Sequence, residues 1–270
     1  MVVQHNMAAS NANRQLGIST NTLSKSTEKL SSGYRINRAA DDAAGLSISE
    51  KMRSQIRGLN KASSNAQDGI SAIQTAEGAL NEAHSILQRM NELATQSAND
   101  TNTTADRTAV QSEVNALTNE LSRIASTSQF NTQNLLDGTF TGKKLQVGAL
   151  ENQKITISIG TMNANALGVA SLDVKSFSKA GSAMTLIQKA ISKVSGQRSE
   201  LGALQNRLEH TVNNLDNISE NTQTAESRIR DTDMASEMVQ YSATSIIQQA
   251  GQSMLAQANS QTQGVLSLIQ

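Results

Sequence analysis

The chain of 270 residues has no proline, no cysteine and no tryptophan, and only 2% of its residues are aromatic. Proline interrupts helices, so its absence favours long unbroken ones. The lack of cysteine excludes disulfides, zinc–thiolate sites and a catalytic thiol. Because aromatic side chains usually dominate thick cores, this composition is better suited to thin seams between helices.

Charge and hydropathy exclude two further classes of protein. The 23 basic and 23 acidic residues balance, so the chain lacks the basic surface expected of a nucleic-acid-binding protein. No apolar run reaches the length of about 18 residues that a membrane span needs, so we expect no contact with a membrane interior. The N-terminus has neither a basic leader nor an apolar stretch, and we therefore expect no cleaved signal peptide.

The first half of the chain has the periodicity of long helices. From Val2 to Leu30 an apolar residue recurs every seven positions, the pattern of a coiled-coil seam. A polar linker from Gly33 to Gly45 follows. Apolar spacings of three and four then continue from about Gly45 to Asn99, which predicts a single helix roughly 80 Å long.

The second half contains the one departure from helical spacing. Thr103 and Asp106 resemble a capping box and predict the start of a shorter helix. Apolar and polar residues alternate over about 144–160, on both sides of a polar stretch, which predicts a β-hairpin. Helical spacing returns over about 184–215 and again from Asp233 onward.

These elements predict a mostly α protein. Its body is a long antiparallel, coiled-coil-like helical rod with a small β-hairpin near 144–160, assigned to residues 45–225. Two rods that run out and back bring the N- and C-terminal helices together. We therefore expect residues 1–44 and 226–270 to pair in a discontinuous terminal-helix domain.

The terminal helices have a weak stripe for so long a pair. The stripe is rich in Ala and Ser, and it contains Gly17 and Gly251. Each glycine lowers helix stability by about 1 kcal/mol relative to Ala. Paired with each other, the two helices bury little, although burial supplies most helical stability in proteins. We expect them to order against identical copies. The residues assigned to polymerisation are Val2, Leu16, Leu23, Leu30, Ile247, Met254, Val265, Leu266, Leu268 and Ile269.

Three stretches of sequence carry a resemblance to a known family. LSSGYRIN (Leu30 to Asn37), followed by DDAAGL (Asp41 to Leu46), strongly resembles the signature of bacterial flagellins. So do the stretches over 197–215 and 225–233, and the resemblance covers residues 1 to about 137 and about 181 to 270. Tyr34 stands where Leu is commoner in the family. The chain also offers only the hairpin where many flagellins carry large variable domains, so it is similar to a minimal flagellin.

The resemblance implies a structural subunit that self-assembles into the filament of the bacterial flagellum, which serves motility. In that family the terminal helices line the inner core of the filament and the rods form the layer outside it. The protein would be secreted to the extracellular flagellum by type III export. The partners implied are further copies of the chain, an export chaperone that holds the C-terminal helix, and the filament cap.

One surface motif implies a further partner. The stretch from Gln88 to Ala98 is similar to the part of flagellin that the flagellin-sensing Toll-like receptor recognises. Arg89, Leu93 and Gln96 lie at helical spacings of four and three, and we expect them off the apolar stripe. Glu113, on the shorter helix, matches a further family contact. The alternative is that these side chains face other subunits.

No constellation of residues indicates an enzyme, a cofactor site or a metal site. The three histidines, His5, His84 and His210, do not form the helical pair of a zinc site. The segment Gly138 to Lys143 has the wrong glycine spacing for a phosphate loop and is predicted to be a turn. The aspartates of the two linkers lack calcium-loop spacing, so we expect helix-capping or ion-pair roles for them.

Two other functions are weighed against the filament subunit. A signalling hairpin like that of chemotaxis receptors should have uninterrupted heptads and no β insertion. A junction protein between hook and filament belongs to the same broad family, and its much lower abundance in sheared appendages would separate it from a filament subunit.

Overall fold

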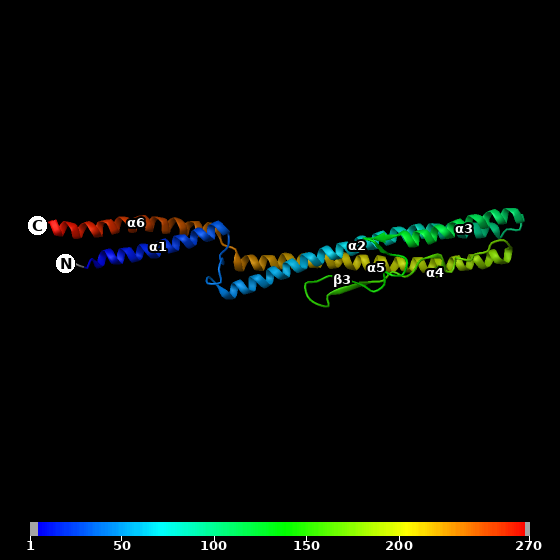
Figure 1. Cartoon of the computed structure of the whole chain (residues 1–270), viewed down its shortest axis with the longest axis horizontal. Coiled ribbons are helices and arrows are strands. Elements are labelled where there is room, and N and C mark those ends of the chain that lie inside the picture. Colours follow the sequence, from blue (N-terminus) through cyan, green and yellow to red (C-terminus); the bar gives the residue numbers. More distant parts are fainter. Residues whose placement is uncertain (1–4, 268–270) are drawn as a thin grey trace. The chain divides into compact units, whose positions relative to one another are not determined.

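The structure, a computed structural model, describes residues 5–267, with the side chains of 262, 263 and 265–267 outside the description. The chain is predominantly helical with a small antiparallel hairpin, as the periodicity predicts (Figure 1). The helices are α1 (Met7–Ser32), α2 (Ala43–Ser97), α3 (Thr104–Thr127), α4 (Ala164–Leu167), α5 (Phe177–Arg230) and α6 (Met234–Ser267). The strands are β1 (Gln129–Phe130), β2 (Gln133–Asn134), β3 (Lys143–Gln146) and β4 (Lys154–Ile157).

The chain divides into two compact units. We call Met1–Ser54 together with Glu220–Gln270 the terminal unit, and Gln55–Ser219 the rod unit. The terminal unit contains α1 and α6, and the rod unit contains α3, α4, all four strands and most of α2 and α5. Among residues 5–267, no helix combines the length and hydropathy that a membrane span requires.

Helix α2 is a single element of 55 residues, as its apolar spacing predicts. The step from Ile73 to Ala76, where two spacings of three follow each other, does not interrupt it. Both side chains are buried at this point. A shortened spacing overwinds the seam locally and leaves the backbone hydrogen bonds of the helix intact.

Helix α3 begins at the predicted capping box. The Thr103 hydroxyl accepts a hydrogen bond from the Asp106 amide, and the Asp106 carboxylate accepts one from the Thr103 amide at 2.9 Å. These reciprocal bonds satisfy two donors that the first turn would otherwise leave open. The hydrogen bonds from Thr103 lower the pKa of Asp106 below its usual value, the hydroxyl contributing most.

The predicted β-hairpin is formed by β3 and β4, which pair antiparallel with Leu145 opposite Ile155. It lies against α2, where the side-chain amide of Asn65 donates to the Gln146 carbonyl at 3.1 Å. Two glycines of α2, Gly58 and Gly69, make this approach close. A Cβ at Gly58 would lie 2.9 Å from the Cβ of Ala149, and one at Gly69 would overlap Leu145.

The sequence pattern missed two short elements. Strands β1 and β2 form a two-residue hairpin whose turn residues, Asn131 and Thr132, both have positive φ. This is the backbone of a tight hairpin turn, but the sequence lacks the Asn-Gly signal that announces one. Helix α4 is a single turn between the Asn163 cap and the left-handed Gly168, too short for a helical period to register.

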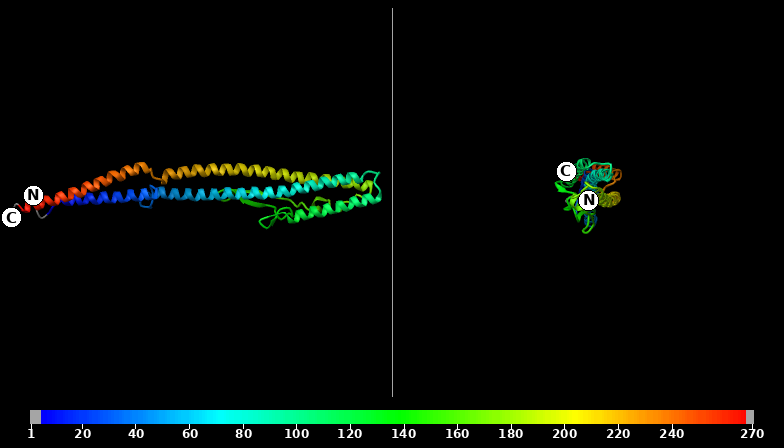
Figure 2. Two further views of the ribbon diagram at one scale, coloured as in Figure 1. Left: turned by 90° about the horizontal axis from the view of Figure 1, so that it is seen from above. Right: turned by 90° about the vertical axis from the view of Figure 1, so that its right-hand side faces the viewer.

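The core of the rod unit lies between three helices. In the left view of Figure 2, α2 runs between α5 and α3. Glu77 of α2 pairs with Arg198 of α5 at 3.3 Å, and Arg89 of α2 pairs with Glu113 of α3 at 2.9 Å. Helix α2 therefore buries two sides in this region. The core also includes residues of the irregular segment over 159–174.

Buried glutamines attach that irregular segment to the helices. The Gln111 side chain of α3 donates to the Leu172 carbonyl and accepts from the Val174 amide, both at 2.8 Å. On α5, Gln197 accepts from the Gly160 amide at 3.2 Å. These bonds satisfy backbone groups that have no partner in a helix or sheet.

Candidate functional site

The seam between α1 and α6 is polar for a helix pair. The two helices lie side by side and antiparallel (Figure 1). The side-chain amide of Asn6 donates to the Ala258 carbonyl at 2.9 Å, and Lys29 pairs with Glu237 at 3.6 Å. Within the described parts of α1 and α6, the residues that are buried and not merely half-buried are the hydroxyl residues Ser19, Ser26 and Thr244. The apolar side chains of the seam are at most half-buried.

Three of the predicted polymerisation residues lie on this seam. Leu16, Leu23 and Leu30 are each half-buried. A Cβ added at Gly251 of α6 would lie 3.5 Å from Leu16 Cδ1, an ordinary contact distance, so Leu16 faces α6 at this point. The leucines of the seven-residue repeat in α1 therefore pack against α6.

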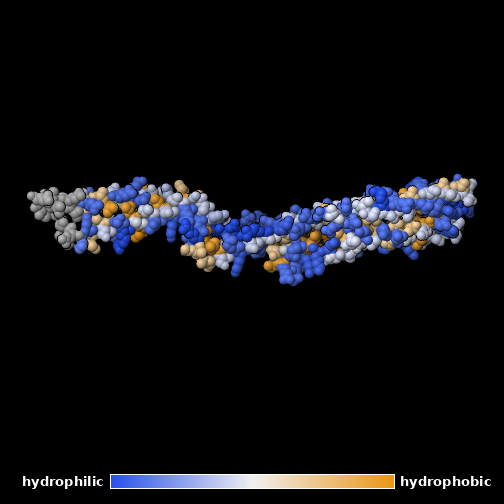
Figure 3. Space-filling view, viewed as in Figure 1, coloured by the Kyte–Doolittle hydropathy of each residue, from blue (hydrophilic) through white to orange (hydrophobic). Residues whose placement is uncertain are grey.

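The terminal helices expose a large set of apolar side chains away from the seam. Figure 3 shows hydrophobic residues on this part of the surface. On α6 the exposed fraction is 70% for Val239, 66% for Ile246 and 63% for Met254. We call the full set the outer apolar face; it consists of Met7, Ile18, Met234, Met238, Val239, Ile246, Ile247 and Met254.

The outer apolar face is not a single stripe. Val239 and Ile246 are seven residues apart, and so are Ile247 and Met254, which places each pair on its own line along α6. Ile246 and Ile247 are neighbours in sequence and point in different directions. A helix that is apolar on most of its circumference is typical of a buried position. In the single chain, α1 covers one side of α6.

Two of the polymerisation residues predicted for α6, Ile247 and Met254, lie on the outer apolar face. The backbone of Val265 and Leu266 belongs to α6, and their side chains lie outside the description. Val2, Leu268 and Ile269 lie outside the described residues altogether. Their assignment stays a prediction.

The linkers at the ends of α1 and α5 are bonded to each other. The Arg35 amide donates to the Arg230 carbonyl at 2.7 Å, and the Thr232 amide donates to the Gly33 carbonyl at 3.0 Å. The Arg230 guanidinium lies 4.7 Å from the centre of the Tyr34 ring and 2.9 Å from Glu50. The Tyr34 ring therefore stacks on a cation here.

Two linker aspartates cap helices, as expected. Asp42 accepts from the Gly45 amide at 2.9 Å in the first turn of α2, and Asp233 accepts from the Ala235 amide at 3.0 Å at the start of α6. Asp41 instead accepts from the amides of Arg38 and Asn37. These bonds, the one from Arg38 first, lower the pKa of Asp41 below its usual value.

The motif similar to the receptor-binding stretch lies where α2 and α3 meet. The Arg89 guanidinium holds Glu113 with two nitrogens, at 2.9 and 3.1 Å, and Glu92 with a third at 3.1 Å. The hydrogen bond to Glu113 is the main reason that the pKa of Arg89 is raised. Gln88 and Gln96 are exposed.

Leu93 differs from what the sequence predicted. It was expected off the apolar stripe, but its side chain is 1% exposed and belongs to the core. The prediction assumed one seam along α2. In this region α2 is covered by both α5 and α3, so the buried stripe is wider and includes Leu93. A partner at this surface would contact Arg89 and Glu113 without reaching the Leu93 side chain.

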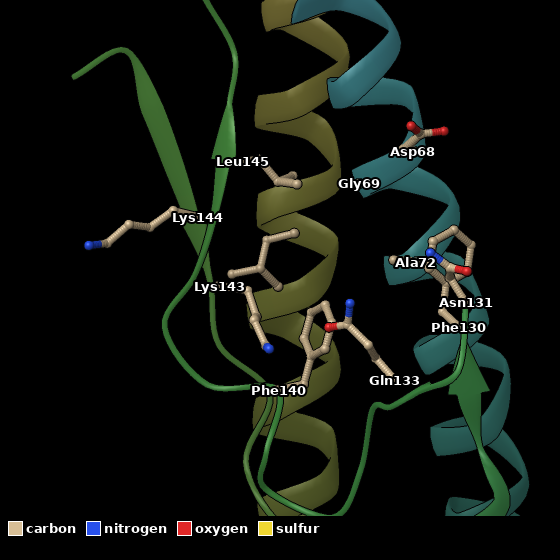
Figure 4. A pocket seen from close by; sticks show the side chains of 11 residues that line it. Asp68, Gly69, Ala72, Phe130, Asn131, Gln133, Phe140, Lys143, Lys144 and Leu145 are labelled. Carbon is tan, nitrogen blue, oxygen red and sulfur yellow. The ribbon is translucent and has the colours of Figure 1, made fainter. Parts of the chain in front are cut away.

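Other features of the rod unit do not form a chemical site. The segment from Gly138 to Gly142, predicted to be a turn, is an irregular bend that leads into β3, and in it the Thr141 hydroxyl donates to the Gly138 carbonyl. A pocket of about 250 Å³ between α2 and the hairpin is lined partly by Phe130, Phe140 and Leu145 (Figure 4). It contains Asp68 and two lysines, and no nucleophile with an adjacent base. Within residues 5–267, no three His, Asp or Glu side chains cluster as metal ligands.

Comparison with known proteins identifies the family. Residues 3–141 match the bacterial flagellin N-terminal helical region, and residues 184–269 match the bacterial flagellin C-terminal helical region. The chain is 56% identical to a flagellin of Halalkalibacterium halodurans over 271 aligned residues, covering 100% of both chains. It is 50% identical to the flagellar filament 33 kDa core protein of Treponema phagedenis, again over 100% of both.

A solved structure is also similar. The crystal structure of Bacillus cereus flagellin matches with a TM-score of 0.50 and 30% identity, covering 56% of this chain and 88% of that one. The names of these relatives are those of structural proteins and not of enzymes. The chain belongs to the bacterial flagellin family.

Proposed function

We propose that this protein is the structural subunit of an extracellular bacterial flagellar filament, built by self-assembly of identical copies. The family membership and the full-length match to a filament core protein support this function. In this proposal residues 1–44 and 226–270 form the assembly domain, and residues 45–225 form the rod outside it.

The observation that carries the proposal is the outer apolar face. Its side chains point in several directions around α6, while the seam with α1 is polar and thin. Burying a large apolar side chain contributes about 1.5–3 kcal/mol. Several such side chains on each subunit make association with more than one neighbouring copy favourable. A helical polymer supplies such neighbours. When a head-to-tail contact between subunits does not close into a ring, the same contact repeats along a filament.

The test compares two charge substitutions at equally exposed positions. Ile246 on the outer apolar face is 66% exposed, and Leu150 near the tip of the hairpin is 68% exposed. We expect Ile246→Asp to abolish polymerisation and Leu150→Asp to leave it close to that of the wild type. Sedimentation and electron microscopy measure the polymer, and circular dichroism checks that both monomers stay helical. Normal filaments from Ile246→Asp would contradict the proposal.

We further propose that the exposed pair Arg89 and Glu113, with Gln88 and Gln96, binds the flagellin-sensing Toll-like receptor. An exposed ion pair contributes at most about 1 kcal/mol to stability, so a partner that competes for these charges meets little resistance. The role of Leu93 in this proposal is to hold α2 in place from within the core.

This second proposal has its own matched control. Replacing Arg89 and Glu113 together by Ala should weaken binding of the monomer to the receptor. The same replacement of Arg123 and Glu120, an exposed pair on α3 with its nitrogen and oxygen 2.6 Å apart, should not. Equal dissociation constants for the two double variants would remove the assignment.

The remaining partners are those that family membership suggests, and the outer apolar face bears on one of them. We propose that the subunit is exported through a type III apparatus, that an export chaperone covers α6 before assembly, and that a filament cap receives the subunit afterwards. The outer apolar face needs such cover while the subunit is free. Ile246→Asp should then weaken binding to the chaperone of the same bacterium in titration calorimetry, and Leu150→Asp should not. Unchanged binding by Ile246→Asp would place the chaperone elsewhere.

A further inference from the structure

Among the methionines of residues 5–267, exposure separates those on α1 and α6 from the others. Met90 and Met162 of the rod unit are 0% and 4% exposed, and Met184 and Met52 are half-buried. All the exposed methionines among the described residues lie on α1 or α6. They are Met7 at 75%, Met234 at 47%, Met238 at 49% and Met254 at 63%.

Met234, Met238 and Met254 belong to the part of the outer apolar face on α6, and Met7 belongs to its part at the start of α1. Met254 continues the line of Ile247, and Met234 and Met238 are four residues apart, so that they form a line of their own. The seam of α1 and α6 does not cover them, since each of the four is about half exposed or more. Their thioethers are therefore open to solvent in the free subunit.

A thioether is the apolar side-chain group that mild oxidants attack most readily. Hydrogen peroxide transfers one oxygen atom to the sulfur, which loses two electrons and becomes a sulfoxide, while the peroxide is reduced to water. The product is polar and chiral, and it disrupts methionine-rich interfaces. The reverse step removes the oxygen as water and oxidises a dithiol to a disulfide, and methionine sulfoxide reductases catalyse it.

We propose that Met7, Met234, Met238 and Met254 are oxidation sites through which peroxide controls assembly. Oxidation of the free subunit turns part of the outer apolar face polar and blocks polymerisation, and reduction restores it. Neighbouring copies cover the same sulfurs in the polymer, so a formed filament resists the oxidant. This inference rests on the proposed self-assembly through the terminal helices.

The first measurement is the pattern of modification. Free subunits are treated with hydrogen peroxide and digested, and the sulfoxide at each methionine is determined by mass spectrometry. The four exposed methionines should react well before Met90 and Met162. The same four should react more slowly in preformed filaments. Equal reactivity of exposed and buried methionines would overturn the assignment of the sites.

The second measurement is polymerisation. Oxidised subunit should need a concentration at least about tenfold higher to polymerise, because the sulfoxides no longer contribute apolar burial at the interface. Treatment with a methionine sulfoxide reductase and dithiothreitol should restore the original value. An unchanged polymerisation concentration after complete oxidation of the four sites would refute the inference and leave the proposed function standing.

Two variants separate these sites from the other methionines. Leu has nearly the volume of Met and cannot form a sulfoxide. In the first variant, which combines Met7→Leu, Met234→Leu, Met238→Leu and Met254→Leu, polymerisation should be the same before and after peroxide treatment. In the second, which combines Met52→Leu and Met184→Leu, peroxide should still impair polymerisation. If the first variant loses polymerisation on oxidation as the wild type does, the control lies elsewhere. If untreated wild-type subunits never polymerise, the proposed function itself is wrong and this inference with it.

Discussion

The close approach of the β-hairpin to α2 allows a sharp test of packing in the rod unit. Gly69 is buried in the middle of α2, and a Cβ there would overlap Leu145 Cδ1 and lie 3.5 Å from Leu208 Cδ1. Gly78, nine residues further along the same helix, is exposed and has no atom within 4 Å of such a Cβ. Replacing either glycine by Ala makes the same chemical change in the same helix.

The two replacements should have different effects on the free energy of unfolding. In a helix interior, Ala is favoured over Gly by about 1 kcal/mol. Gly78→Ala should gain this amount. Gly69→Ala gains it too, but it also forces Leu145 away from the core, and overpacking of this kind costs about 1–3 kcal/mol. The two variants should therefore differ by about 1–3 kcal/mol, with Gly69→Ala the less stable.

Urea unfolding followed by circular dichroism measures both values. A double-mutant cycle identifies the cause: in the background of Leu145→Ala, the penalty of Gly69→Ala should disappear, because the atom it overlaps has been removed. Gly78→Ala should show no coupling to Leu145→Ala. If Gly69→Ala stabilises the protein as much as Gly78→Ala does, Leu145 makes room for the added methyl group without cost and the overpacking argument is wrong.

Two further predictions concern buried polar groups and acid. Gln111→Leu should lower the free energy of unfolding by about 2–4 kcal/mol, since it leaves the Leu172 carbonyl and the Val174 amide unpaired; the exposed Gln67→Leu should change it by less than about 0.5 kcal/mol. Equal effects in denaturant unfolding would contradict the first. The pKa of Asp106 is lowered in the folded state, so its stabilising contribution is present above its unfolded pKa of about 4 and is lost as pH falls through the folded value. Wild type should therefore lose more stability between about pH 6 and about pH 3 than Asp106→Ala does, as measured by melting temperature, and identical pH profiles would show that this carboxylate does not contribute.

Elements with a strong local signal were predictable from the sequence. The apolar spacing of α2 and the capping box at Thr103 and Asp106 depend on residues within a few turns of one another, and the structure has both. The alternation around Leu145 and Ile155 likewise predicted the hairpin. The spacing of α2 and the alternation of the hairpin are periodic because part of each element faces solvent, and the order of residues records that contrast. The capping box needs only two residues three positions apart.

Other features depend on what lies across from a residue, which the order of residues does not contain. Leu93 is buried because α3 covers a second side of α2, and a single helical stripe cannot show that a second helix packs there. Gln111 looks like an ordinary polar residue of α3 until the irregular segment supplies its backbone partners. The sequence by itself determined the long helices, the β3–β4 hairpin and the resemblance to the family. Tertiary structure decided which apolar residues of α1 and α6 lie in the thin seam and which lie on the exposed face. This division depends on how two helices that are far apart in the sequence are rotated toward each other.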